Sequence, residues 1–144
     1  MTMQMIEEYC PIEDEVYMND RQVEFFREKL LSRRLDLVES AKGFVETLKE
    51  STVRKPDPVD QSSANAEMSL DFQNRYRQQN VIREIDYALG RMADGEYGYC
   101  EITGEEIGLK RLLARPMATM CVEIQEQHER MSHRPGKYAM PCLL

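Results

Sequence analysis

The chain has 144 residues, a length that fits one compact domain or a small domain with a long extension, so its core is small. With 42% hydrophobic and 31% charged residues, ten Met, no Trp and seven Gly, the composition indicates a mostly α-helical soluble protein. Of the net charge of −7, −6 arises within residues 1–20, which hold six acidic side chains but no Lys or Arg: Glu7, Glu8, Glu13, Asp14, Glu15 and Asp20. The nearly neutral remainder lacks the basic stripe that direct duplex DNA binding requires.

The apolar runs and the N-terminal residues indicate the compartment, and the compartment indicates how the cysteines are used. No apolar run approaches the roughly 18 residues of a membrane span, and the N-terminus lacks the basic start and apolar core of a signal peptide. We therefore expect a cytoplasmic protein without a membrane partner. In such a chain Cys10, Cys100, Cys121 and Cys142 are expected to be thiols or metal ligands rather than a disulfide framework.

A helical pattern begins at Asn19 or Asp20, either of which can cap a helix. Apolar residues then recur at the a/d spacing of a coiled coil, at Phe26, Leu30, Leu37, Phe44 and Leu48. The prolines of Lys55-Pro56-Asp57-Pro58 end this helix and force a turn.

A second long helix is expected after the turn, with Asp60 or Ser62 as its cap and an uninterrupted stretch over residues 67–92. Its apolar seam is clear at Ile82, Ile85, Leu89 and Met92. The seam is diluted further up by polar residues, Asn74, Arg75, Gln78 and Gln79. Residues 19–94 therefore predict an antiparallel coiled-coil hairpin about 45 Å long, with its tip near residues 54–62.

The stretch GYCEITGEEIGLKRLLARPMATMCVEI, residues 98–124, resembles a four-cysteine zinc knuckle with two ligands missing. Cys100 and Cys121 stand where two ligands would be, but Thr103 and Ile124 occupy the positions of the other two. A threonine hydroxyl is a poor zinc ligand and isoleucine is none, so we expect no zinc. We expect Ile124 to fill apolar space and Thr103 to donate a hydrogen bond in the turn before Gly104, which needs a left-handed backbone.

The rest of this C-terminal region is less distinctive. A helix is expected over residues 117–131, after Pro116, and His128 and His133 are read as surface histidines rather than ligands. The predicted domains are thus an acidic segment, 1–18, packed on the globular module; the hairpin, 19–94; a degenerate zinc-finger, zinc-ribbon-like module, 95–134; and a flexible tail, 135–144.

These blocks, in this order, are similar to the DksA family of bacterial transcription factors over nearly the whole chain. The resemblance is carried by EVYMNDRQVEFFREKLL, KPDPVDQSS, EMSLDFQNRYR and the knuckle sequence, and it is strongest to members that lack two of the zinc cysteines. It implies a non-enzymatic factor whose coiled coil enters the secondary channel of RNA polymerase. It also implies that tip aspartates alter the lifetime of initiation complexes, often together with ppGpp in the stringent response.

The resemblance assigns roles to particular residues. Asp57 and Asp60 match the family's tip aspartates, and Ser62 stands where the family usually has alanine. The three positions of the family's ppGpp site hold Glu84, Arg115 and Gln125, of which only Arg115 is the expected cation. Arg83, Lys110 and Arg111 are near enough in sequence to substitute. An acid and an amide in place of two cations weaken the attraction for a polyphosphate.

Two alternatives from other functional classes remain open. A thiol-based redox regulator would require an accessible Cys100 or Cys121 and activity that changes on oxidation. A dimeric coiled-coil scaffold would associate through the apolar seam and be indifferent to Asp57 and Asp60. No nucleophile–base pair, phosphate-binding loop or metal–carboxylate cluster in the sequence supports an enzyme.

Overall fold

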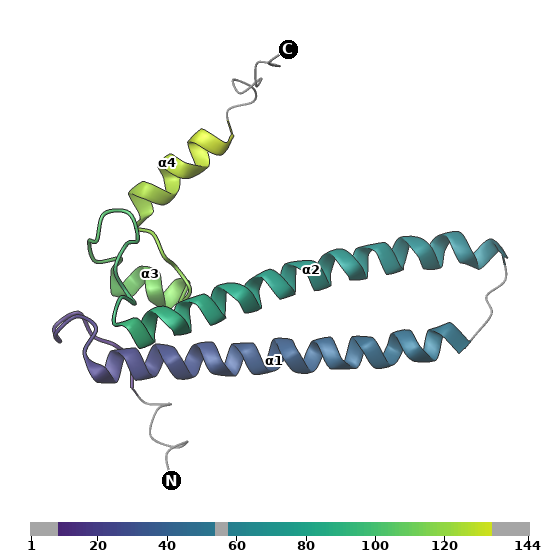
Figure 1. The fold of residues 1–144 in the computed structure, drawn as a ribbon, viewed down its shortest axis with the longest axis horizontal. Helices are drawn as coiled ribbons and strands as arrows, with labels where there is room; N and C mark the ends of the chain where they lie inside the picture. The colour runs from purple at the N-terminus through teal and green to yellow at the C-terminus, as the bar shows by residue number, and fades with distance from the viewer. Residues whose placement is uncertain (1–8, 54–57, 134–144) are drawn as a thin grey trace, which may run out of the picture. The chain divides into compact units, whose positions relative to one another are not determined.

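A computed structural model describes residues 9–53 and 58–133 of the chain. It contains four helices, α1 (Asp20–Val53), α2 (Pro58–Asp94), α3 (Leu109–Ala114) and α4 (Val122–Ser132). The chain forms two compact units, which divide between Tyr97 and Gly98 (Figure 1). In the described part of the chain, no helix is both long enough and apolar enough to cross a bilayer.

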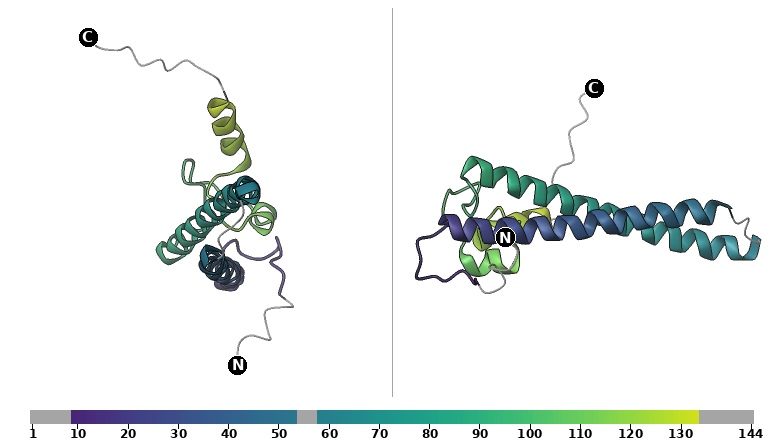
Figure 2. Two further views of the ribbon diagram at one scale, coloured as in Figure 1. Left: turned by 90° about the vertical axis from the view of Figure 1, so that its right-hand side faces the viewer. Right: turned by 90° about the horizontal axis from the view of Figure 1, so that it is seen from below.

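The first unit is the predicted antiparallel hairpin of α1 and α2, which run side by side and wind across each other (Figures 1 and 2). Asn19 caps α1 as expected, because its side-chain oxygen accepts a hydrogen bond from the backbone amide of Gln22 at 2.9 Å. The expected start of the second helix is wrong. Helix α2 begins at Pro58, so Asp60 and Ser62 lie inside its first turns rather than before it. Proline is suited to a first helical position because its missing amide hydrogen has no partner there in any case.

The hairpin is packed most tightly at its base. Phe26 and Leu30 of α1 and Ile85 of α2 are fully buried, and the Phe26 ring lies 5.9 Å from that of Tyr97. Further along, Leu37, Phe44 and Leu48 of the same predicted seam are only half-buried. An exposed ion pair between Arg34 and Asp86, 2.6 Å long, links the helices between these two regions. The apolar seam is therefore continuous in sequence but close-packed only near the base.

Residues 9–18 lie against the first turns of α1. The Tyr9 ring packs edge-on against Phe25 with a centroid separation of 6.0 Å, and the Arg21 guanidinium stacks over Tyr9 at 4.7 Å. Tyr9 and Asn19 both donate hydrogen bonds to the Glu15 carboxylate, which lowers the pKa of Glu15. The acidic segment thus begins the hairpin unit, and its expected packing on the globular module stays a prediction.

Over residues 98–133, the second unit contains two short helices joined by turns. The predicted helix over residues 117–131 is wrong at its start, because α4 begins at Val122 with Cys121 as its N-cap residue. A six-residue helix, α3, was not expected, and it buries Leu109 and Leu112. The predicted flexible tail, 135–144, lies outside the described residues.

Candidate functional site

The hairpin tip is the first candidate site. Asp57 lies outside the described residues, while Asp60 and Ser62 are in the first turns of α2, where only the backbone is described. A carboxylate at the start of a helix is stabilised by the unpaired amide groups and the positive end of the helix dipole. The backbone is described for Asp60, near the start of α2, and the functional role of the tip stays a prediction.

The knuckle turn is the second candidate site, and it is built by backbone hydrogen bonds. Tyr99 and Glu106 form an antiparallel bridge, and the amide of Gly104 bonds to the carbonyl of Cys100 at 2.9 Å. Gly104 has a φ of 73°, the left-handed conformation that the sequence predicted for it. Residues 100–104 thus form a tight turn.

A second loop joins this turn and brings Cys121 to it. The amide of Glu101 donates to the carbonyl of Thr119 at 3.0 Å, and the Arg111 side chain donates to the carbonyl of Met120 at 2.9 Å. The loop leads directly to Cys121 at the start of α4. The two halves of the degenerate knuckle are therefore brought together by hydrogen bonds from protein groups.

The Cys100 sulfur is the centre of this arrangement. Burial opposes ionisation of the thiol, whose residue is only 3% exposed. Hydrogen bonds from the Thr103 hydroxyl and from the amides of Thr103, Cys121 and Ile102 outweigh that effect and lower the pKa of Cys100 to about 6. The Thr103 oxygen accepts a hydrogen bond from the amide of Glu105 at 3.4 Å, and the bond that Thr103 was expected to donate in the turn stays a prediction.

These residues do not fit a structural zinc ion. Four donor atoms at tetrahedral corners are needed, and the knuckle offers two cysteines, a neutral hydroxyl and an aliphatic side chain. Ile124 is half-buried in α4, and His128 and His133 are exposed. Across residues 9–53 and 58–133, no group of three or more His, Cys, Asp or Glu side chains is arranged to hold a metal.

The residues at the family's ppGpp positions belong to different parts of the fold. Glu84 is exposed on α2 in the first unit. Arg115 is exposed at the end of α3, and the half-buried Gln125 of α4 donates its amide to Glu129 at 2.8 Å. Of the cations that could substitute at these positions, Arg83 and Lys110 are exposed, whereas Arg111 donates a hydrogen bond to the carbonyl of Met120. A single retained cation does not by itself form a polyphosphate site.

Sequence reasoning did not identify a third feature, a groove between α1 and α2 midway along the hairpin. Its volume is about 430 Å³. The feature of the sequence that could have indicated this groove is the run of polar residues that interrupts the apolar seam of α2.

Comparison with known proteins covers both units. Residues 22–92 match the family model described as the N-terminal domain of DnaK suppressor protein DksA, and residues 95–130 match that of the prokaryotic dksA/traR C4-type zinc finger. The chain is 48% identical over 123 residues to the RNA polymerase-binding transcription factor DksA of Caulobacter vibrioides, covering 85% of this chain and 87% of the relative. It is 36% identical over 118 residues to the protein of the same name from Escherichia coli K12, covering 82% and 78%.

A solved structure agrees with these relatives. Transcription factor DksA2 from Pseudomonas aeruginosa superposes with a TM-score of 0.74 at 36% identity, covering 82% of this chain and 91% of that one. The two family models together match residues 22–92 and 95–130, so the resemblance of the sequence is confirmed at the level of the family. The chain belongs to the DksA family, whose members are transcription regulators rather than enzymes.

Proposed function

We propose that this protein binds RNA polymerase directly and regulates transcription initiation from the secondary channel. Its relatives are named RNA polymerase-binding transcription factors, and this chain aligns with them over most of their length. The observation that carries the proposal is the family match across residues 22–92, which coincides with a two-helix hairpin. The regulatory residues are Asp57 and Asp60, which match the tip aspartates of the family in sequence.

The shape of the hairpin suits this role. Its helices have 34 and 37 residues, so each is about 50 to 55 Å long at 1.5 Å per residue. A pair of helices is narrow enough to enter a channel and long enough to carry carboxylates deep into it. There the tip acts by charge and hydrogen bonding on a magnesium-centred site or its mobile elements, without performing chemistry itself.

The proposal includes function without zinc and a weakened response to ppGpp. Hydrogen bonds to the Cys100 sulfur take the place of metal ligation in joining the two halves of the knuckle. At the ppGpp positions, Glu84 and Gln125 supply no positive charge, so Arg115 alone attracts the polyphosphate.

The test of the tip is Asp60→Asn, which removes one charge and keeps the size of the side chain. Purified wild-type and variant proteins are compared in multi-round transcription from a ribosomal RNA promoter and in direct binding to polymerase. We expect the variant to lose control of transcription while its affinity for polymerase stays within about twofold, because one charge is removed and the hairpin that carries it is unchanged. Asp71→Asn, on an exposed residue further along α2, is the matched control and should behave as wild type.

The outcomes separate the parts of the proposal. Retained control by Asp60→Asn contradicts the tip mechanism while leaving polymerase binding in place. Absence of binding by the wild-type protein contradicts the proposed partner and favours the scaffold or redox alternative.

A further inference from the structure

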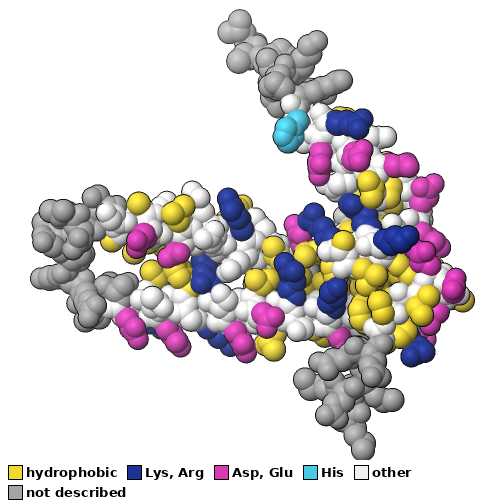
Figure 3. Space-filling view, turned by 180° about the vertical axis from the view of Figure 1, so that it is seen from behind, with side chains coloured by type: hydrophobic (Ala, Val, Ile, Leu, Met, Phe, Trp, Pro, Cys, Tyr) yellow, Lys and Arg dark blue, Asp and Glu magenta, His cyan; other side chains and the backbone are white. Residues whose placement is uncertain are grey.

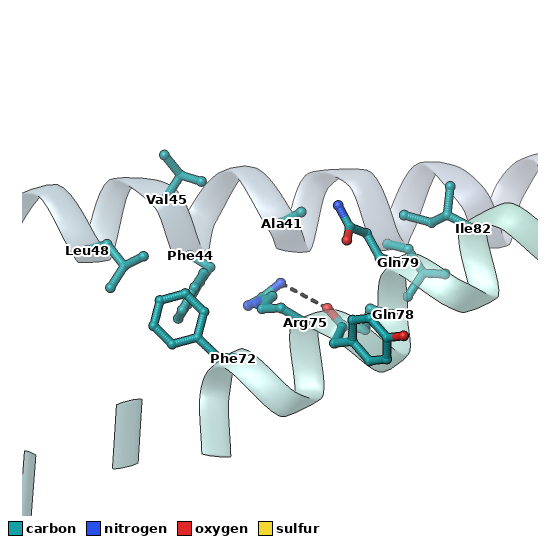
Figure 4. Close-up of a pocket in the computed structure, with 11 residues that line it drawn as sticks. Ala41, Phe44, Val45, Leu48, Phe72, Arg75, Gln78, Gln79 and Ile82 are labelled. Atoms are coloured by element: carbon teal, nitrogen blue, oxygen red, sulfur yellow. Dashed lines mark hydrogen bonds between the residues drawn. The ribbon is translucent and has the colours of Figure 1, made fainter. Parts of the chain in front are cut away.

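The groove between α1 and α2 is an unusual feature for a coiled coil. Apolar side chains of both helices line it, and it is open where a heptad seam would normally be filled. Figure 4 shows its lining, and Figure 3 shows hydrophobic side chains gathered between the helices in this part of the hairpin. The residues are Leu37, Ala41, Phe44, Val45 and Leu48 of α1, and Phe72, Arg75, Tyr76, Gln78, Gln79 and Ile82 of α2. Its volume of about 430 Å³ lies in the range of small-molecule sites.

Apolar surface in and around the groove is left in water. Phe44 and Phe72 meet edge-on across the helices with a centroid separation of 6.0 Å, yet Phe72 is 54% exposed. Tyr76 and Val45 are 64% and 49% exposed. An apolar occupant would remove this surface from water, at a gain of about 25 cal/mol for each Å² covered.

Arg75 supplies a positive charge to the lining of the groove. Its guanidinium stacks on the Phe44 ring at 4.6 Å, and its Nη1 donates to Ser40 at 3.1 Å and to Gln78 at 3.0 Å. These contacts hold the side chain across the groove toward α1, as Figure 4 shows. Within the described residues no carboxylate pairs with Arg75, and its other guanidinium N–H groups have no hydrogen-bond partner. A positioned cation with spare donors is suited to a carboxylate.

We propose that this groove binds a small amphiphilic carboxylate, with its apolar body along Phe44 and Phe72 and its carboxylate on Arg75. A single anionic group matches the single cation in the lining, whereas a polyphosphate would need several. The polar neighbours Gln78 and Gln79 are neutral and do not repel an anion. This site is separate from the tip aspartates and does not depend on the proposed action on polymerase.

The test uses full-length protein and two probes of equal chain length, octanoate and 1-octanol, in titrations followed by ¹⁵N chemical shifts. We expect shifts confined to residues 37–48 and 72–82, and octanoate to bind about tenfold more tightly than octanol because a charged hydrogen bond is formed only by the acid. Each added methylene should strengthen binding by about fourfold, so decanoate binds more tightly than octanoate.

Variants assign the charge. Arg75→Gln should abolish the preference for octanoate over octanol, whereas Lys42→Gln, an exposed cation outside the lining, should retain it. Ala41→Leu, which fills the groove from α1, should weaken the binding of both probes. Circular dichroism confirms that each variant is folded, and the comparison of the two probes on wild-type protein needs no variant.

Three results would overturn the proposal. Equal affinity for octanoate and octanol removes the role of Arg75. Shifts that map to residues 98–133 place the binding elsewhere. A sedimentation experiment in which wild-type protein dimerises and Ala41→Leu does not would show that a second copy of the chain covers the groove.

Discussion

Cys100 has an environment that its residue type alone does not reveal. Burial of its thiol favours the neutral form, yet the Thr103 hydroxyl and three backbone amides favour the thiolate and lower the pKa. The donors come from Ile102 and Thr103 in one turn and Cys121 in the other. The pKa of one thiol therefore depends on two segments that are separated in sequence.

This environment makes stability depend on pH. The pKa of Cys100 is lowered in the folded protein from its usual 9.0 to about 6, so between these values the unfolded chain binds a proton that the folded one does not. We expect stability to rise as the pH increases from about 6 to 9, and to lose this contribution as the pH falls through 6. Urea unfolding at several pH values measures it, and Cys100→Ser should flatten the rise. A rise of equal size in the variant would assign it to another group.

At this scale the sequence predicted part of the site. Gly104 was placed correctly because a left-handed turn strongly favours glycine, whereas the hydrogen bond that Thr103 was expected to donate stays a prediction. The effect of the backbone amides on the Cys100 thiol was not predictable, because backbone groups carry no sequence signal of their own. The amide of Cys121 reaches the Cys100 sulfur only once Thr119 and Met120 are fixed by their partners.

The hairpin differs in packing between its two ends. Leu30 is fully buried near the base, whereas Leu48, on the same apolar seam, is only half-buried toward the turn. The ion pair of Arg34 and Asp86 adds little, since both side chains are more than 40% exposed and such pairs contribute about 0 to 1 kcal/mol. Most of the free energy that holds α1 against α2 therefore comes from the base.

A matched pair of truncations tests this difference. Leu30→Ala should lower the free energy of unfolding by about 3 kcal/mol, because it leaves a cavity in a close-packed region. Leu48→Ala should cost about 1 kcal/mol, because the site is already partly in water. Chemical denaturation compares the two, and equal costs would show that the distal part is as well packed as the base.

Secondary structure was predictable where periodicity extends over many turns. The seam from Phe26 to Leu48 predicted α1, and the one from Ile82 to Met92 predicted the base of α2. Helix ends were less predictable, since Pro58 begins α2 although Asp60 and Ser62 are better capping residues. Helix α3 has only six residues, too few for a periodic pattern to stand out, and packing of Leu109 and Leu112 supports it instead.

The whole molecule combines a family fold with a changed set of residues at the positions of the zinc ligands. Residues 95–130 match a C4-type zinc-finger family, but only two of the four cysteines are present in the knuckle. We propose that the hairpin and the turn around Gly104 form without the missing pair. The proposed regulator should therefore keep both its stability and its activity when metal is withheld.

Chelation tests this expectation. Treatment with EDTA should leave the melting temperature and the control of transcription of the wild-type protein unchanged. The double variant Thr103→Cys, Ile124→Cys restores four thiols and should bind zinc stoichiometrically, and its melting temperature should then fall on chelation. Zinc in the purified wild-type protein, with a melting temperature that EDTA lowers, would contradict the proposal.

The amides and the hydroxyl that favour the Cys100 thiolate belong to the chain itself, so their effect on stability does not depend on the concentration of a ligand. When a protein binds a ligand only in its folded state, a free ligand concentration one hundred times the dissociation constant raises the free energy of unfolding by about 2.7 kcal/mol. This stabilisation is lost as the ligand becomes scarce. Backbone amides and a threonine hydroxyl are always present at fixed stoichiometry. We therefore expect the abundance of the folded regulator to be set by its synthesis and not by the zinc supply of the cell.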